Sequence, residues 1–154
     1  MKYAVRYPAI LLTLVVITLF AFPAFGQSEP LGKWRLTAYN WEGKLEHPLD
    51  GVEITLNINT EGKLGGKSGC NTYGGSWELD NGKLKITDIF STKMFCGADS
   101  NLFESSYYEF LGKAAKFTIE KGKLTLTDPK SPKFMEFAEV KKPRITPMIN
   151  TKTR

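Results

Sequence analysis

The stretch VEITLNIN, residues 52–59, decides the fold. Its apolar residues Val52, Ile54, Leu56 and Ile58 alternate strictly with polar ones. A period of two is typical of a β-strand that buries one face. Thr60-Glu61-Gly62 follows as a turn, and the Gly-rich residues 63–68 return as a second strand, since glycine lets another backbone approach closely. The stretch therefore predicts an antiparallel pair of strands.

The same alternation continues on both sides of this pair. It predicts further short strands within residues 34–39, 76–79, 83–86, 117–119, 123–126 and 134–137. Asn81-Gly82 separates two of these strands, and Lys121-Gly122 repeats the arrangement later in the chain. Asn-Gly between alternating runs is a strong hairpin signal. We expect seven or eight strands joined by hairpins, which excludes a parallel sheet because that sheet would need crossover helices.

One segment has a helical period instead. After the polar cluster Asp99-Ser100-Asn101, apolar residues recur every three or four positions and predict a single helix over about 101–113. They are Phe103, Tyr107, Phe110, Leu111 and Ala114. Any of the three polar residues suits the N-cap, and Gly112 weakens the last turn. The predicted fold is mainly β with one helix (α+β), a small curled antiparallel sheet or β-barrel of about 7–8 strands whose mouth or face the helix covers.

The first 26 residues have the layout of a secretory signal peptide. Lys2 and Arg6 precede the apolar run 9–22, and Pro23 leads to the small residues of Ala24-Phe25-Gly26. The alternative is a retained anchor, because residues 7–28 are uncharged and long enough to span a bilayer. Both interpretations predict an exported protein, in the periplasm, the outer envelope or the medium, with membrane contact only through this segment if it is uncleaved.

The net charge of +5 is not spread over the chain. Residues 27–140 carry 14 basic and 16 acidic side chains, whereas 141–154 carry five basic and no acidic ones. The central part therefore lacks the basic face that nucleic-acid binding needs. We expect 141–154 to be a flexible, solvated basic tail, with contact to anionic surface polymers as the alternative.

Few residues support catalysis or cofactor binding. Gly65-Gly66-Lys67-Ser68-Gly69 lacks the earlier glycine of a phosphate-binding loop, and His47 is the only histidine. One histidine and two cysteines are too few for an ordinary zinc site. We therefore expect no catalytic residues, no metal and no cofactor. Cys70 and Cys96 form an even pair in an exported chain, which favours a disulfide.

Two motifs then point to a family. Ser68-Gly69-Cys70-Asn71-x-Tyr73-x-Gly75 is followed by Ser91-Thr92-x-Met94-x-Cys96, and this pair resembles the META/HslJ-like domain. In that family a glutamate then opens an amphipathic helix, and Glu104, with Tyr108 and Leu111 after it, matches. Gly32-Lys33-Trp34 and Leu124-Thr125-Leu126 fit the ends of the domain. The resemblance covers about residues 31–140 and predicts a domain over 27–140.

The resemblance implies a compact antiparallel barrel-like fold with one helix. It also implies a small envelope or secreted protein associated with heat shock, stress tolerance, and secretion or motility. Many members are lipid-anchored, but no cysteine precedes Cys70, so we expect no lipid attached to a processed N-terminal cysteine.

The motif residues have mainly structural interpretations. Gly69 and Gly75 suit positive φ or close approach, Asn71 bonds a turn, and Tyr73 buries its ring with its hydroxyl paired. Thr92 and Met94 should alternate with Cys96 along one strand face beside Cys70.

Three functional hypotheses follow. The first is a non-enzymatic, monomeric envelope protein that supports stress tolerance by binding proteins or small apolar molecules. The second is a carrier with an apolar ligand inside the barrel, although Trp34, Trp41 and Trp77 fill a core by default. The third is an inhibitor of an envelope hydrolase, inserting the loop 40–51 with Trp41 as anchor.

Overall fold

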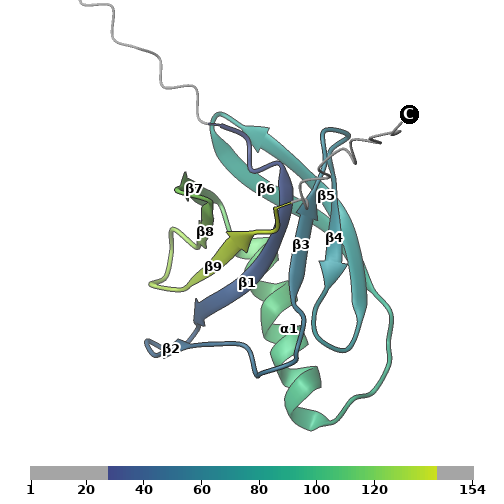
Figure 1. Cartoon of the computed structure of the whole chain (residues 1–154). Helices are drawn as coiled ribbons and strands as arrows, with labels where there is room; N and C mark the ends of the chain where they lie inside the picture. Colours follow the sequence, from purple (N-terminus) through teal and green to yellow (C-terminus); the bar gives the residue numbers. More distant parts are fainter. Residues whose placement is uncertain (1–27, 142–154) are drawn as a thin grey trace, which may run out of the picture.

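The computed structural model describes residues 28–141, so the predicted signal peptide or anchor (1–26) and the tail after Lys141 lie outside the described residues. One helix and nine strands make up this part of the chain (Figure 1). They are β1 (Gly32–Asn40), β2 (Leu45–Glu46), β3 (Thr55–Ile58), β4 (Lys63–Lys67), β5 (Thr72–Asp80), β6 (Lys83–Ser91), α1 (Ala98–Lys113), β7 (Lys116–Glu120), β8 (Lys123–Thr127) and β9 (Phe134–Glu139).

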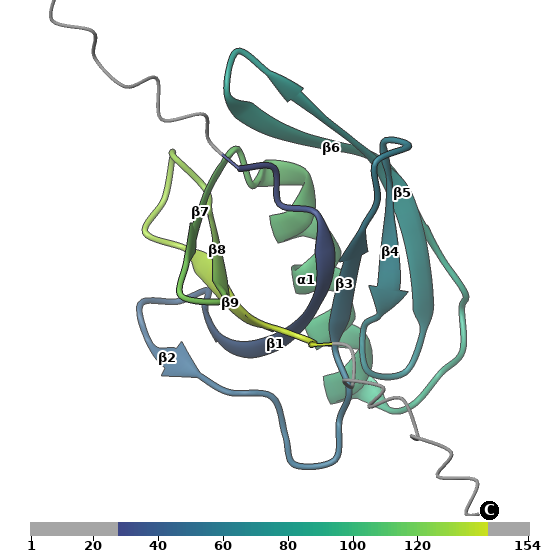
Figure 2. The same cartoon turned by 45° about the horizontal axis from the view of Figure 1, so that its top comes forward.

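The strands form one curled antiparallel sheet, which confirms the predicted fold class. Its order is β6-β5-β4-β3-β1-β9-β8-β7, with the two-residue β2 beside the end of β1. The sheet bends around α1, which lies across the opening between its ends β6 and β7 (Figure 2). The Leu84 N–H donates to the Ala115 carbonyl at 3.1 Å near this opening. The fold is therefore a half-barrel that its helix closes.

The start of β3 differs from the sequence prediction. Regular pairing begins at Thr55 and not at Val52, and Ile54 forms only an isolated bridge to Ser68. Val52 is exposed, and its N–H donates to the Leu49 carbonyl at 3.0 Å. The chain is still turning at Val52, so the alternation extends three residues beyond the strand that it predicts.

The helix also starts earlier than its sequence indicates. It begins at Ala98, and the N-cap is Gly97, which makes no side-chain capping hydrogen bond. The predicted caps at 99–101 are therefore wrong. Gly97 has φ 102°, a conformation that glycine adopts without strain, and it turns the chain into the helix directly after Cys96. Gly112 is still helical, and α1 ends at Lys113.

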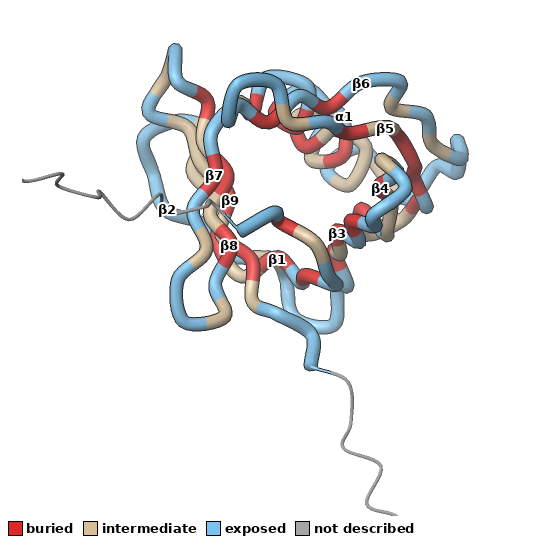
Figure 3. Tube along the Cα trace, turned by 90° about the horizontal axis from the view of Figure 1, so that it is seen from above, coloured by how far each residue is buried: buried red, intermediate tan, exposed pale blue. Residues whose placement is uncertain are grey.

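Side chains fill the space inside the curled sheet. Buried residues alternate with more exposed ones along the strands and recur along α1 (Figure 3). The core includes Trp34, Leu36, Leu56, Trp77, Tyr107, Leu111, Leu124, Leu126, Met135 and Phe137. Both core indoles are paired, since Trp34 Nε1 donates to the Pro30 carbonyl and Trp77 Nε1 to the Asn59 carbonyl, each at 2.9 Å. These side chains form a packed core inside the curled sheet.

The glycines of β4 permit unusually close strands. A Cβ atom at Gly66 would lie 2.1 Å from the Thr55 carbonyl oxygen, and one at Gly65 would lie 2.6 Å from that of Tyr73. Both neighbours are backbone atoms, which cannot rotate away as a side chain can. The glycine-rich sequence is therefore a requirement of the β3–β4–β5 packing.

We predict that Gly66→Ala lowers the free energy of unfolding by at least about 2 kcal/mol, because β3 must move to accept the methyl group. Gly112→Ala is the control, since its Cβ meets nothing within 4 Å and alanine favours a helix by up to about 1 kcal/mol. Urea denaturation of both variants measures the difference. Equal stability of the two variants would contradict this account of β4.

Candidate functional site

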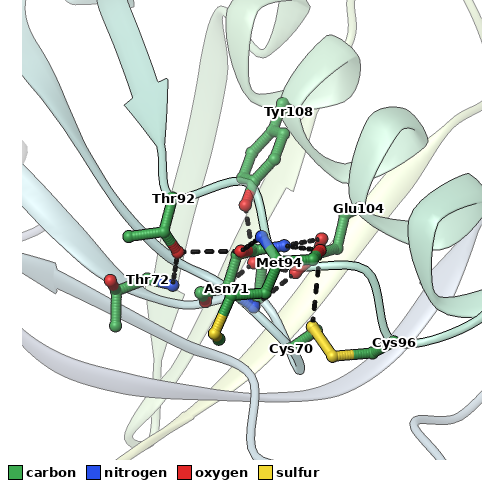
Figure 4. Close-up of a disulfide and its surroundings, with 9 residues drawn as sticks. Cys70, Asn71, Thr72, Thr92, Met94, Cys96, Glu104 and Tyr108 are labelled. Atoms are coloured by element: carbon green, nitrogen blue, oxygen red, sulfur yellow. Dashed lines mark hydrogen bonds between the residues drawn. A yellow bond between two sulfur atoms is a disulfide. The ribbon is translucent and has the colours of Figure 1, made fainter.

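The two motifs meet at one end of the half-barrel, where Cys70 and Cys96 pair. Their Cα atoms lie 6.1 Å apart, a separation that suits a disulfide (Figure 4). Cys70 follows β4, and Cys96 immediately precedes the N-cap of α1. The predicted disulfide is therefore supported, and it joins the loop after β4 to the loop after β6.

Glu104 is the centre of this region, although it is buried. Its carboxylate accepts hydrogen bonds from Ser68 Oγ at 2.6 Å, from the Asn71 N–H at 2.7 Å and from Asn71 Nδ2 at 2.5 Å. None of the ion pairs formed within residues 28–141 involves Glu104. Hydrogen-bond donors, and not a cation, therefore stabilise the Glu104 carboxylate. A carboxylate that only accepts hydrogen bonds suits a site with three donors.

Ser68 extends this arrangement to a second residue of α1. Its single hydroxyl proton faces two acceptors, the Glu104 carboxylate at 2.6 Å and the Asn71 carbonyl at 3.0 Å, so the Tyr108 hydroxyl, 2.6 Å away, must donate to Ser68 Oγ. Partial burial raises the pKa of Tyr108, which keeps this donor protonated. Tyr108 therefore donates to Ser68 whichever of the two acceptors Ser68 uses.

Asn71 connects Glu104 to the second motif. Its Oδ1 accepts from Thr92 Oγ1 and from the Met94 N–H, both at 2.8 Å, while Nδ2 also donates to the Met94 carbonyl at 3.2 Å. Every donor and acceptor of this buried amide is occupied, which fixes its orientation. One side chain therefore holds both backbone groups of Met94.

The predicted strand through Thr92, Met94 and Cys96 is wrong. β6 ends at Ser91, and residues 92–97 have no regular secondary structure. The amide of Asn71 takes the Met94 N–H and carbonyl, the groups that a neighbouring strand would otherwise pair. The three residues do lie beside Cys70 and Asn71, as expected, but an amide side chain brings them there.

The other motif residues act in packing. Gly69 has φ 103°, whereas a Cβ at Gly75 would lie 3.0 Å from the Thr87 carbonyl. Tyr73 is buried and donates to the Thr55 carbonyl at 2.9 Å, so the Tyr107 hydroxyl, 2.8 Å away, donates to Tyr73. Burial raises the pKa of both hydroxyls well above the usual tyrosine value, so both stay neutral.

Two clefts lie beside α1. The first is bounded by residues 41–46, by α1 from Asp99 to Lys113 and by residues 128–133, and the second by residues 48–54, by residues 67–70 and by the start of α1. Their volumes are about 760 Å³ and about 640 Å³, and Tyr39, Asp99 and Phe103 line both. Tyr39, Trp41 and Phe103 pack together with ring centroids 4.4–5.4 Å apart. We call the two clefts together the trough. The first extends toward Lys133, and the second toward Val52 and the disulfide.

Sequence reasoning missed the trough. Phe103 is recognisable as an apolar helix position, but nothing local indicates that it meets Tyr39 and Trp41, more than sixty positions away. Trp41 itself packs against the core instead of projecting from its loop. His47 lies in that loop and donates to the Thr37 carbonyl at 2.7 Å.

Two functional features are missing from the described part of the chain. No group of three or more His, Cys, Asp or Glu side chains within it could hold a metal ion. No helix between residues 28 and 141 combines the length and the hydropathy needed to cross a membrane.

We predict that Glu104→Gln lowers the free energy of unfolding by about 2–3 kcal/mol. The new amide group must face one of three donors, which leaves that donor buried and unpaired. Glu109→Gln on the same helix is the control, because Glu109 is exposed and pairs only with Lys113. Chemical denaturation at pH 7 compares them, and a Glu104 variant as stable as the control would disprove the role of this carboxylate.

The disulfide yields a separate prediction. Replacing both Cys70 and Cys96 by serine should lower the free energy of unfolding by roughly 3 kcal/mol, because the closed loop restricts the unfolded chain. Reductant should destabilise the natural protein similarly and leave the double variant unaffected. Two reactive thiols in the untreated protein would refute the pairing.

Solved structures of other proteins have a similar fold. An NMR structure of a protein from Burkholderia xenovorans is 25% identical, with a TM-score of 0.62 over 72% of this chain and 83% of that one. A second NMR structure is 22% identical, with a TM-score of 0.53 over 71% of this chain and 91% of its own, and this likeness shows the fold alone. A crystal structure of a DUF4847 family protein from Bacteroides vulgatus ATCC 8482 is 18% identical, with a TM-score of 0.48 over 72% and 94% of the two chains.

A search of curated proteins gives no significant match. The family model of the META domain matches residues 29–141, which include the whole described sheet and its helix. The chain belongs to the META domain family.

Proposed function

We propose that this META domain is a non-enzymatic, exported binding module that acts as a monomer and supports stress tolerance in the cell envelope. Its ligand is a protein segment or a small apolar molecule, held outside the sheet. The trough is the observation that carries this proposal, because binding sites are concave and largely apolar with a few polar groups.

The composition of the trough suits such a ligand. The aromatic group of Tyr39, Trp41 and Phe103 separates the two clefts, and the exposed side chains of Leu49 and Leu102 extend the apolar surface on either side. Charged residues line both clefts as well. Among them, Lys113 is paired with Glu109, and Lys67 is paired with Glu53. A ligand would therefore meet an apolar centre with charged groups beside it.

Two observations support an exported, non-enzymatic role. A disulfide is stable in oxidising compartments, in agreement with the signal-peptide layout of the first 26 residues. The buried polar groups of the motif satisfy one another, so Glu104 and Asn71 have no free position toward a substrate. Their arrangement favours a scaffold over general acid–base chemistry.

The earlier alternatives have weaker support. A carrier would need space where the core is packed. An inhibitor would need an anchor that projects, yet Trp41 packs on Tyr39 and Phe103, and the exposed apolar residues of that loop are Leu45 and Leu49.

The test combines a deletion strain with trough variants. The double variant Leu49→Glu/Leu102→Glu places one charge in each cleft. Both positions are exposed, so the fold should tolerate the substitutions. Val140→Glu is the matched control, an exposed apolar residue at the opposite end of β1, where the Val140 N–H donates to the Lys33 carbonyl. We expect the natural gene and the control to restore survival under heat and hydrophobic antibiotics, and the double variant to restore at least tenfold less.

Two results would reject the proposal. One is an unchanged survival of the deletion strain under these stresses. The other is full restoration by the double variant, with its fold verified by circular dichroism.

A further inference from the structure

The disulfide lies where the trough meets the start of α1. Cys96 immediately precedes the N-cap Gly97, and both cysteines line the second cleft. Cys96 is exposed and Cys70 is half-buried. Structural disulfides resist reduction, whereas exposed ones are the labile and regulatory kind. The position of this bond therefore makes it a candidate site of thiol–disulfide exchange.

The start of the helix makes few contacts apart from this bond. None of residues 95–102 is buried or packs against the core, and the first buried residue of α1 is Glu104. The N-cap makes no side-chain hydrogen bond, so the first helical N–H groups lack the partner that a cap supplies. The Oδ1 atom of Asn101 is shielded from solvent without a hydrogen-bond partner, which is a further cost. Little in the core therefore holds the first turn of α1.

The sequence of this turn favours a different helix start. Asp99, Ser100 and Asn101 are among the residue types that cap a helix best, and they are weak helix formers inside one. In the structure all three are helical, because the chain enters α1 directly after Cys96. A helix that began after one of them would gain a side-chain cap and lose no buried residue. The turn therefore has an alternative, shorter arrangement.

The disulfide opposes the shorter helix through the length of the chain. A helical residue advances the chain by about 1.5 Å, whereas an extended one advances it by about 3.3 Å. Unwinding residues 98–100 therefore lengthens the path between the helix and Cys96. With Cys96 joined to Cys70 the extra length must bulge outward, but without the bond Cys96 can move away. Asn71 still holds Met94, so the movement is confined to residues 95–100.

We propose that the Cys70–Cys96 disulfide is a redox switch that selects between two starts of α1. In the oxidised protein the helix begins at Ala98. In the reduced protein it begins later and is capped by one of residues 99–101.

The switch changes one end of the trough. Asp99 and Ser100 both line the second cleft, and they leave it when the first turn unwinds. Phe103 stays helical and remains packed on Tyr39 and Trp41. The change in conformation needs no ligand, whereas its use in controlling a ligand rests on the function proposed above.

The reductant is a dithiol, carried by a protein or a small molecule. One of its thiolates attacks Sγ of the exposed Cys96, which forms a mixed disulfide and releases Cys70 as a thiolate. The second thiolate of the reductant then displaces Cys96 and closes the reductant's own disulfide. The dithiol thereby loses two electrons and two protons, and the protein gains two thiols.

Backbone NMR of the exported protein tests the switch, before and after complete reduction with dithiothreitol. Cα chemical shifts report the helical population of each residue. We expect the helical shifts of residues 98–100 to fall by more than half on reduction, because side-chain caps replace the first turn. Those of residues 104–113 should not change. Contacts between the rings of Phe103 and Trp41 should persist, which verifies that the fold is retained.

Two variants separate the bond from the caps. Cys70→Ser/Cys96→Ser should show the reduced pattern with and without dithiothreitol. Asp99→Ala/Ser100→Ala/Asn101→Ala removes the alternative caps and places strong helix formers in the first turn. This triple variant should keep the helical shifts of residues 98–100 after reduction.

Three outcomes would overturn the proposal. One is a fully reduced natural protein that keeps the helical shifts of residues 98–100. Another is a triple variant that loses them as the natural protein does, since the caps would then have no part in the change. The third is a loss of the ring contacts between Phe103 and Trp41, because reduction would then release more than the first turn. None of these measurements involves a ligand, so their failure is distinct from a failure of the trough variants to affect survival.

Discussion

The carboxylate of Glu104 lies where α1, the loop after β4 and the loop after β6 meet, and the hydrogen bonds that it accepts hold these three segments together. Burying a carboxylate without a cation is unfavourable unless donors replace the lost water. Ser68 and Asn71 supply those donors from one loop, and Asn71 passes the constraint to Met94 in the other. Together with the buried side chains of Tyr107, Phe110 and Leu111, this group holds the helix across the half-barrel.

The disulfide and the Asn71 amide, at neighbouring positions, constrain the two loops in different ways. Cys70 and Cys96 limit how far the two loops can separate, but a covalent bond between two side chains leaves the backbone between them free to rotate. Asn71 removes that freedom, since it binds the N–H and the carbonyl of Met94 at once. The disulfide therefore limits the separation of the loops, whereas the Asn71 hydrogen bonds fix the orientation of the backbone, and neither replaces the other.

Much of the sheet could be predicted because its signals are local. Alternation along 83–86 and the Asn81-Gly82 turn specify a hairpin from a few residues. The two motifs, at 68–75 and 91–96, were sufficient to indicate the family. The start of α1 could not be predicted, since a disulfide and the φ of Gly97 override three good caps. The same holds for residues 92–96, where a distant amide takes the place of a neighbouring strand, and for the trough, whose aromatic rings come from distant segments.

The ligand proposed for this domain lies outside its packed core. Trp34 and Trp77 belong to that core, and both donate their indole N–H groups to backbone carbonyls. Both cysteines of the disulfide line the second cleft of the trough. A change at the disulfide would therefore alter that cleft, whereas a change at Leu102 would alter the first, because Leu102 lines the first cleft only. The covalent tie is therefore the point at which the motif region and binding in the trough would be coupled.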